Sequence, residues 1–123
     1  MNNRLYNCKN PYQGSAKKVL CVCSAGLLRS PTTAVVLQRE YGYNTRAAGI
    51  DAGHALIPLD SVLLEWADEI VCMDERQALG IRDIADRDGV IITGVRVLNV
   101  PDSYAYMDEK LQELILERYA EAL

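Results

Sequence analysis

Short apolar runs alternate along the chain with longer segments of helical periodicity. Compact apolar runs bounded by turn residues are typical of buried strands, and apolar residues spaced three and four apart are typical of helices. The pattern predicts strands at residues 17–22, 44–48, 69–73 and 95–100. It predicts helices at residues 31–41 and 59–67, a helical stretch that opens at Asp74, and a last helix after Asp108. This alternation indicates an α/β fold of three layers, with a parallel sheet between helices.

Capping and turn residues mark the ends of these elements. Ser30 is the expected N-cap of the first helix, and Pro31 falls in its first turn, where proline is tolerated. The segment 83–89 is polar and is predicted to be a turn. Trp66 is expected in the core. Asp108 is the expected cap of the last helix, and the apolar face of that helix is formed by Leu111, Leu114, Ile115 and Tyr119.

A length of 123 residues fits one domain with a single core. Residues 1–14 are predicted to form a flexible N-terminal arm, and residues 15–123 the folded domain. The net charge is −4, and no lysine or arginine run is longer than Lys17-Lys18. Nucleic-acid surfaces need clustered basic residues, so no nucleic-acid partner is expected. No apolar stretch reaches the roughly 20 residues of a membrane helix, and residues 1–14 lack a signal-peptide core, so we expect a cytoplasmic protein with no membrane partner.

The four cysteines do not form a metal-binding or disulfide pattern. Cys8, Cys21, Cys23 and Cys72 include no pair at the spacing of a zinc site, and His54 is the single histidine. We therefore predict no metal and no cofactor. The cytoplasm keeps thiols reduced, so a disulfide framework is not expected. Cys21 and Cys72 fit the role of small buried apolar residues.

The loop from Cys23 to Ser30 lies directly between a predicted buried strand and a predicted helix. A loop of this length can curl so that successive backbone N–H groups point inward and bind an anion. The following helix adds the partial positive charge of its N-terminus. The candidate substrate-binding residues of this loop are Ser24, Ala25, Gly26, Leu27 and Leu28.

Three side chains at the ends of this loop supply chemistry. The planar guanidinium of Arg29 can hold two phosphate oxygens. The positive field around the loop favours the thiolate form of Cys23, which is the nucleophilic form of a cysteine. Ser30 can donate a hydrogen bond to the sulfur and make it a better leaving group. The loop is therefore a candidate site for phosphate-ester hydrolysis on Cys23.

Cleavage of a phosphate ester also needs an acid that protonates the leaving oxygen. Asp102 follows the strand predicted at residues 95–100 and is the candidate acid, with Asp74, at the end of another strand, as the alternative. Ligands of parallel sheets bind beyond the carboxyl ends of the strands, where these loops converge. Tyr104 and Tyr106 are candidates for the wall of the pocket, against an aromatic leaving group. His54 is expected to be a solvated loop residue.

Residues 22–31, Val-Cys-Ser-Ala-Gly-Leu-Leu-Arg-Ser-Pro, resemble the signature of the low-molecular-weight protein tyrosine phosphatases, C-x-G-N-x-C-R-S-P. Residues 66–74, Trp-Ala-Asp-Glu-Ile-Val-Cys-Met-Asp, are similar to the W-A-D-x-I-x-x-M segment of that family. Ala48-Gly49 is similar to the family's S-A-G segment, and Pro101-Asp102 lies where the family has its Asp-Pro loop. The resemblance extends over most of the chain from Lys17 onward.

The resemblance implies a four-stranded parallel sheet and a two-step hydrolysis of phosphomonoesters without metal. It implies Cys23 as nucleophile, Arg29 as phosphate clamp, Ser30 as stabiliser of the thiolate and Asp102 as general acid. The expected substrate is a phosphotyrosine protein or a small aryl phosphate. The chain departs from the family pattern in having Gly26 in place of the loop asparagine, Leu28 in place of the second loop cysteine, and a proline before the acid instead of after it.

Two alternatives remain open at this point. The first is a module that binds phosphate or a phosphopeptide without chemistry. The second, less favoured, is an arsenate reductase, which needs further cysteines to relay a disulfide outward. A related hypothesis is that Cys21 or Cys72 protects an oxidised Cys23 by forming a disulfide with it.

Overall fold

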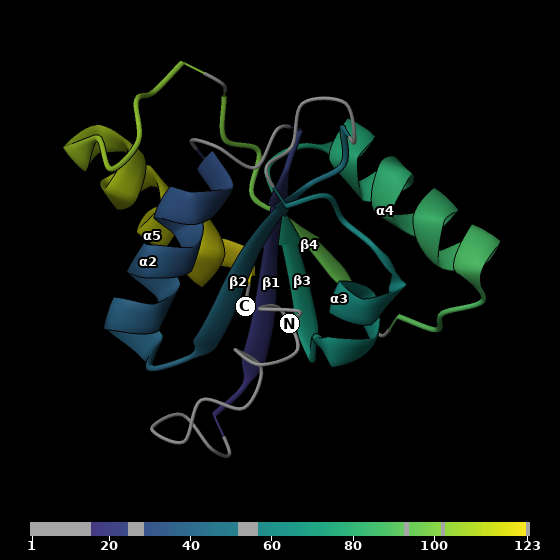
Figure 1. Cartoon of the computed structure of the whole chain (residues 1–123). Helices are drawn as coiled ribbons and strands as arrows, with labels where there is room; N and C mark the ends of the chain where they lie inside the picture. The colour runs from purple at the N-terminus through teal and green to yellow at the C-terminus, as the bar shows by residue number, and fades with distance from the viewer. Residues whose placement is uncertain (1–15, 25–28, 52–56, 93, 102, 123) are drawn as a thin grey trace.

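The computed structural model describes residues 16–24, 29–51, 57–92, 94–101 and 103–122, so the predicted arm of residues 1–14 lies outside the described residues. Four parallel strands form one sheet in the order β2-β1-β3-β4 (Figure 1). These strands are β1 (Lys18–Cys23), β2 (Asn44–Gly49), β3 (Glu69–Cys72) and β4 (Val95–Val97). The predicted α/β fold with a four-stranded parallel sheet is confirmed.

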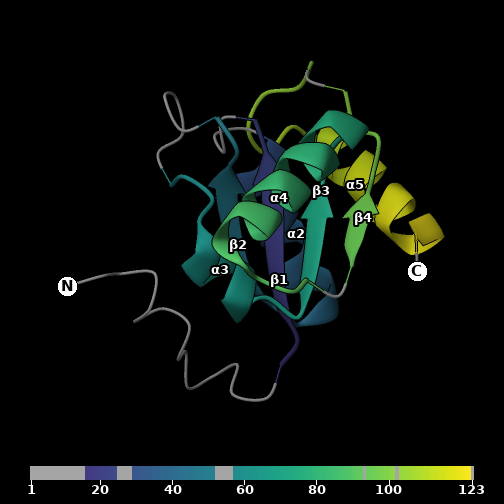
Figure 2. The same cartoon turned by 90° about the vertical axis from the view of Figure 1, so that its right-hand side faces the viewer.

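Helices cover both faces of the sheet, as the three-layer prediction requires (Figures 1 and 2). α2 (Arg29–Tyr41) and α5 (Glu109–Ala122) lie on one face. α3 (Ser61–Trp66) and α4 (Glu75–Asp88) lie on the other. A parallel sheet needs this cover because its connections return over both faces and leave the strands without a solvent-facing side.

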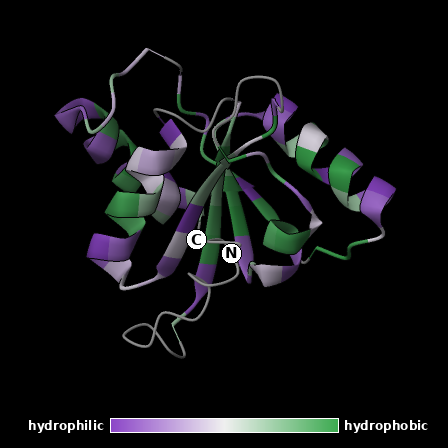
Figure 3. Ribbon diagram, viewed as in Figure 1, coloured by the Kyte–Doolittle hydropathy of each residue, from purple (hydrophilic) through white to green (hydrophobic). Residues whose placement is uncertain are grey.

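β1 is the central strand and is buried on both faces. Its residues from Val19 to Cys23 are at most 3% exposed. Because strand side chains alternate, Val19, Cys21 and Cys23 pack towards α2 and α5, whereas Leu20 and Val22 pack towards α3 and α4. The uninterrupted hydrophobic colouring of β1 beyond its first residue in Figure 3 reflects this two-sided burial. The predicted first strand is confirmed.

The turn predicted at residues 83–89 is wrong. α4 continues without a break to Asp88 and ends at Gly89, whose φ of 68° is the left-handed conformation that glycine adopts without strain. Ile81, Ile84 and Ala85 keep the helical spacing and pack against the second core cluster. The polar residues between them lie on the solvent side, and their density made the segment look like a turn.

The strand predicted at residues 95–100 is shorter than expected. β4 ends at Val97, although the N–H groups of Leu98 and Val100 still donate to the carbonyls of Cys72 and Met73, at 3.0 and 2.9 Å. Asn99 between them has a φ of 56°, which interrupts the extended backbone. Asparagine is one of the residues that tolerate this conformation. After β4 the chain therefore stays hydrogen-bonded to the carboxyl end of β3, although it no longer forms a regular strand.

The remaining boundaries agree closely with the pattern of the sequence. Trp66 is 8% exposed and packs in the second core cluster. The carboxylate of Asp108 accepts a hydrogen bond from the N–H of Lys110 at 2.8 Å, at the start of α5. Within α5, Leu111, Ile115 and Tyr119 are fully buried.

The predicted cap of the first helix differs from the structure. α2 begins at Arg29, so Ser30 lies inside the first turn instead of capping it. Among the described residues no helix is long and apolar enough to cross a membrane.

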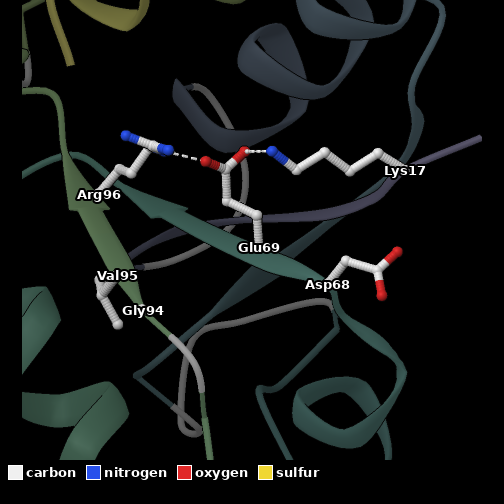
Figure 4. A pocket seen from close by; sticks show the side chains of 6 residues that line it. All are labelled: Lys17, Asp68, Glu69, Gly94, Val95 and Arg96. Atoms are coloured by element: carbon white, nitrogen blue, oxygen red, sulfur yellow. Dashed lines mark hydrogen bonds and ion pairs between the residues drawn. The ribbon is translucent and has the colours of Figure 1, made fainter. Parts of the chain in front are cut away.

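A network of polar side chains lies at the amino ends of the strands (Figure 4). Glu69 is 6% exposed, and its carboxylate forms an ion pair with Arg96 on one side and with Lys17, at 3.3 Å, on the other. The hydroxyl of Tyr119 donates to the same carboxylate at 2.8 Å. Burial and the hydrogen bonds with Tyr43 and Glu69 raise the pKa of Tyr119, and the hydrogen bond with Glu69 raises the pKa of Arg96. Asp68 points away from Glu69 in Figure 4, and its carboxylate accepts from the N–H of Lys18.

Substitution of Arg96 by methionine tests this network. Arg96→Met leaves the buried carboxylate of Glu69 with fewer partners, so the free energy of unfolding is expected to fall by about 1–3 kcal/mol. Urea denaturation measures the change. Adding Glu69→Gln in the same chain removes the buried charge and is expected to restore part of the loss. Arg82→Met, at an exposed position of α4, is the control and is expected to change stability by less than about 0.5 kcal/mol. A double variant whose loss equals the sum of the single losses would contradict the network.

Candidate active site

The strand order reverses between β1 and β3, and this reversal places the candidate site. From β1 the chain continues to β2 on one side, and β3 then pairs with β1 on the other side. Connections that leave adjacent strands in opposite directions open a crevice beyond their carboxyl ends, where ligands of α/β sheets bind. Cys23 ends β1, and Met73 and Asp74 follow β3. The carboxyl ends of the strands lie at the top of the sheet in Figure 1, where the chain that follows β4 also runs.

Cys23 lies beside the first turn of α2. Its Sγ atom is 3.2 Å from the Oγ atom of Ser30, and Cys23 is 3% exposed. The hydroxyl of Ser30 is also 3.4 Å from the carbonyl oxygen of Ala48 at the end of β2. A hydroxyl in this position can donate to the sulfur when Cys23 is a thiolate. The arrangement therefore brings together the candidate nucleophile and its candidate stabiliser, which are separated by seven positions in the sequence.

Arg29 begins α2 and is 5% exposed. Its Nη1 atom donates a hydrogen bond of 2.9 Å to the carbonyl of Val100 and lies 4.0 Å from a carboxylate oxygen of Asp74. The guanidinium is thus held between the chain after β4 and the start of α4. A planar cation fixed in this way keeps little rotational freedom to lose on binding an anion.

A hollow of about 470 Å³ opens at this place. Arg29 and Asp74 lie in its wall together with Arg76 from the first turn of α4. The other residues of the wall are uncharged: Ser24, Met73, Asn99, Val100 and Pro101. The lining comes from the chain segments that follow β1, β3 and β4, which agrees with the convergence of loops expected from the sequence.

Several predicted site residues lie outside the described residues. These are the loop positions Ala25, Gly26, Leu27 and Leu28 and the candidate acid Asp102. His54, which was expected to be a solvated loop residue, also lies outside the described residues. The neighbours of Asp102 are described, and Pro101 lies in the wall of the hollow. Tyr104 packs against the core cluster of α2 and α5, and Tyr106 is 53% exposed. Neither tyrosine is among the described residues that line the hollow.

Asp74, the alternative acid, has two structural contacts. It is the N-cap of α4, and its Oδ1 atom accepts a hydrogen bond of 2.9 Å from the N–H of Gln77. Its Oδ2 atom faces Arg29. Both carboxylate oxygens of Asp74 therefore contact other protein groups, the N–H of Gln77 and the guanidinium of Arg29. This environment favours a role for Asp74 in orienting Arg29.

Gln77 is a site residue that the sequence analysis missed. It is fully buried, its Oε1 atom accepts from the N–H of Met73 at 2.7 Å, and its Nε2 atom donates to the hydroxyl of Ser24 at 3.3 Å. Gln77 therefore connects the start of the candidate phosphate loop to the end of β3. The spacing Asp74-x-x-Gln77 resembles a capping box, in which the third residue reaches back to the helix start, and that pattern was the available signal.

The three described cysteines differ in their surroundings. Burial is the main cause that raises the pKa of Cys72 to about 12, and it also raises the pKa of Cys21 well above its ordinary value. Cys72 packs on the face of α3 and α4, opposite to Cys23. Cys21 shares the face of Cys23 but lies two residues away in the same extended strand, with its side chain parallel to that of Cys23. A disulfide needs facing side chains at close range, so neither thiol is placed to protect Cys23.

Metal binding finds no support in the part of the chain that the structure describes. No three histidine, cysteine, aspartate or glutamate side chains gather there in a way that could hold an ion. Among the described residues that line the hollow, the one carboxylate is that of Asp74, which faces Arg29.

No protein-family model matches the chain, and no curated protein sequence matches it. Solved structures do match. Vibrio vulnificus Wzb in complex with benzylphosphonate has a TM-score of 0.66 and 23% sequence identity, over 89% of this chain and 100% of the other. A low molecular weight protein tyrosine phosphatase from Bacillus subtilis has a TM-score of 0.56 and 22% identity, over 86% and 96%. The YwlE arginine phosphatase from Geobacillus stearothermophilus has a TM-score of 0.55 and 18% identity, over 85% and 91%.

These similarities show that the chain has the fold of the low-molecular-weight protein tyrosine phosphatases. The resemblance inferred from residues 22–31 and 66–74 is therefore confirmed at the level of the fold. The sequence identities to the three structures named above are only 18 to 23%.

Removal of the Gln77 side chain tests its bracing role. Gln77→Ala leaves the buried N–H of Met73 without its partner, so we expect the free energy of unfolding to fall by about 1–3 kcal/mol. Ser24→Ala removes the other partner of one bond and is expected to have a smaller effect. Since the two residues share that bond, the double variant is expected to lose less than the sum of both. Gln38→Ala, at an exposed position of α2, is the control in urea denaturation. A loss no larger than that of Gln38→Ala would refute the brace.

Oxidation with peroxide tests the isolation of Cys23. We expect Cys23 to be converted to sulfenic and then sulfinic acid, with no crosslink to Cys21 or Cys72. A non-reducing digest analysed by mass spectrometry separates these products. Recovery of a peptide that joins Cys23 to Cys72 would require the sheet to open, because the two side chains lie on opposite faces, and would contradict the described packing.

Proposed function

We propose that this protein is a phosphomonoester hydrolase of the protein-tyrosine-phosphatase type that forms a phosphocysteine intermediate on Cys23. The observation that carries the proposal is the grouping of Cys23, Ser30 and Arg29 at the switch point of the sheet. There the sulfur lies 3.2 Å from the Ser30 hydroxyl, and the guanidinium of Arg29 is anchored at the edge of the hollow. The fold shared with known phosphatases supports the proposal.

In the first step the thiolate of Cys23 attacks phosphorus. A sulfur–phosphorus bond forms, the bond from phosphorus to the leaving oxygen breaks, and that oxygen takes a proton from Asp102. Arg29 and the backbone N–H groups of the loop stabilise the charge on the phosphoryl oxygens. Asp74 and the carbonyl of Val100 act earlier, by fixing Arg29 before substrate arrives.

In the second step a water molecule attacks phosphorus and the sulfur leaves as a thiolate. Asp102, now ionised, accepts the proton of that water. The hydroxyl of Ser30 donates to the departing sulfur and stabilises its negative charge. The products are an alcohol or phenol from the first step and inorganic phosphate from the second. No metal takes part in either step.

The substrate we propose is an aryl phosphate, such as phosphotyrosine in a protein. Wzb of Vibrio vulnificus was solved with benzylphosphonate, in which a methylene group joins an aromatic ring to a phosphonate, and this supports a substrate with an aromatic ring close to the phosphoryl group. Another neighbour is named an arginine phosphatase, so phosphoarginine is to be tested as a second substrate. We propose a cytoplasmic protein, in which the Cys23 thiol stays reduced.

The test is hydrolysis of p-nitrophenyl phosphate in the presence of a metal chelator. We expect the wild type to turn over, Cys23→Ser to show no turnover because it lacks the thiolate, and Asp102→Ala to lose about 10²–10⁴-fold in kcat. Cys72→Ala is the matched control, since it removes a thiol that faces away from the site, and it is expected to stay active. Activity that survives in Cys23→Ser would refute the phosphocysteine.

Two further measurements on the wild type separate the alternatives. If wild type shows no turnover but inorganic phosphate raises its Tm, the protein is a phosphate-binding module. An arsenate reductase would consume arsenate with thiols and form a disulfide on Cys23. The opposite placement of Cys72 and the parallel placement of Cys21 argue against such a relay among the described cysteines.

A further inference from the structure

Arg76 is a second arginine in the wall of the hollow, besides Arg29. It is exposed, and it forms no hydrogen bond or ion pair with any residue that the structure describes. Arg29, by contrast, is nearly buried and contacts Val100 and Asp74. One guanidinium of the wall is therefore buried and held by two contacts, whereas the other belongs to an exposed residue that has no hydrogen bond or ion pair among the described residues.

The position of Arg76 in α4 is electrostatically unfavourable. The N-terminus of a helix carries partial positive charge, so acidic residues stabilise the first turn and basic residues destabilise it. Asp74 and Glu75 follow this rule, as N-cap and first helical residue. Arg76 opposes it, directly after them. Residues that break a local rule without a compensating contact are expected at functional sites, where binding makes use of the charge.

The charges of the hollow show what Arg76 is available to bind. Among the described lining residues only Arg29, Asp74 and Arg76 are charged. Asp74 faces Arg29 at 4.0 Å and caps α4, so its charge is engaged inside the site. In the proposed function Arg29 binds the phosphoryl group. The charge of Arg76 is then left for a second anionic group of the same substrate, next to the phosphate.

We propose that Arg76 is a specificity residue that selects phosphotyrosine segments carrying carboxylate side chains beside the phosphorylated residue. This inference rests on the proposed function for the phosphoryl site, and adds the class of sequence that the site accepts. An exposed arginine contributes modestly to one ion pair, so the preference is expected to be about two- to fivefold. It is also expected to shrink as salt rises towards about 0.5 M, because exposed charges are screened.

The experiment measures binding in the full chain carrying Cys23→Ser, so it does not depend on turnover. The probes are two fluorescent phosphotyrosine peptides that differ in their flanking residues, glutamate and aspartate in one and glutamine and asparagine in the other. Fluorescence anisotropy gives the Kd of each. We expect the acidic peptide to bind about two- to fivefold more tightly. Rates of hydrolysis of both peptides by the wild type are measured in parallel.

Substitutions at Arg76 assign the preference to this side chain. Arg76→Gln is expected to abolish the difference between the peptides, Arg76→Lys to keep most of it, and Arg76→Glu to reverse its sign. Arg82→Gln is the matched control, because it removes the same charge from an exposed position of α4 that does not line the hollow. It is expected to leave the preference unchanged.

The outcomes separate this inference from the proposed function. Equal affinity for both peptides, no binding of either, or a preference that survives in Arg76→Gln overturns the role of Arg76, whatever the activity. An Arg76-dependent preference without hydrolysis by the wild type overturns the hydrolase and leaves Arg76 as a recognition residue of a binding module.

Discussion

β1 lies in the middle of the sheet with no face open to solvent, and its burial determines where chemistry can take place. Each of its side chains beyond Lys18 is committed to one of two core clusters. A strand of this kind can present reactive groups only where it ends. Cys23 is the last residue of β1 and belongs to the core, and Ser24, which follows it directly, lies in the wall of the hollow. The helices, the strand order and the site depend on this one buried strand.

The sequence predicted those features that depend on local pattern. Strands and helices were placed by apolar spacing, and Cys23, Arg29 and Ser30 by their spacing between a strand and a helix. It failed where local composition and tertiary packing disagree. The polar residues of the segment 83–89 suggested a turn, but Ile81, Ile84 and Ala85 pack in the second core cluster and keep the chain in α4 as far as Asp88. The strand predicted to end at Val100 is broken by the backbone conformation of Asn99, which no periodicity encodes.

Contacts between segments that are distant in the sequence could not be predicted either. The anchor of Arg29 is the carbonyl of Val100, a group that every residue has and that carries no signature. Gln77 had a signal in its spacing from Asp74, but its bond to Ser24 joins positions 53 residues apart and needs the fold to become visible. Arg118 is a similar case, because it donates to the carbonyls of Leu98 and Asn99 and so holds the chain after β4. Such groups position the reactive residues without resembling them.

The amino ends and the carboxyl ends of the strands have different roles. At the amino ends, Glu69 gathers Arg96, Lys17 and Tyr119 into a closed polar cluster, far along the strands from Cys23. At the carboxyl ends, the polar groups face a hollow. Because the length of the strands lies between the cluster and the hollow, substitutions that stabilise the cluster and substitutions that alter the hollow fall on different residues. A library for directed evolution could therefore randomise the exposed residues Arg76 and Pro101 in the wall of the hollow, while the buried Gln77 and the amino-end cluster are kept unchanged.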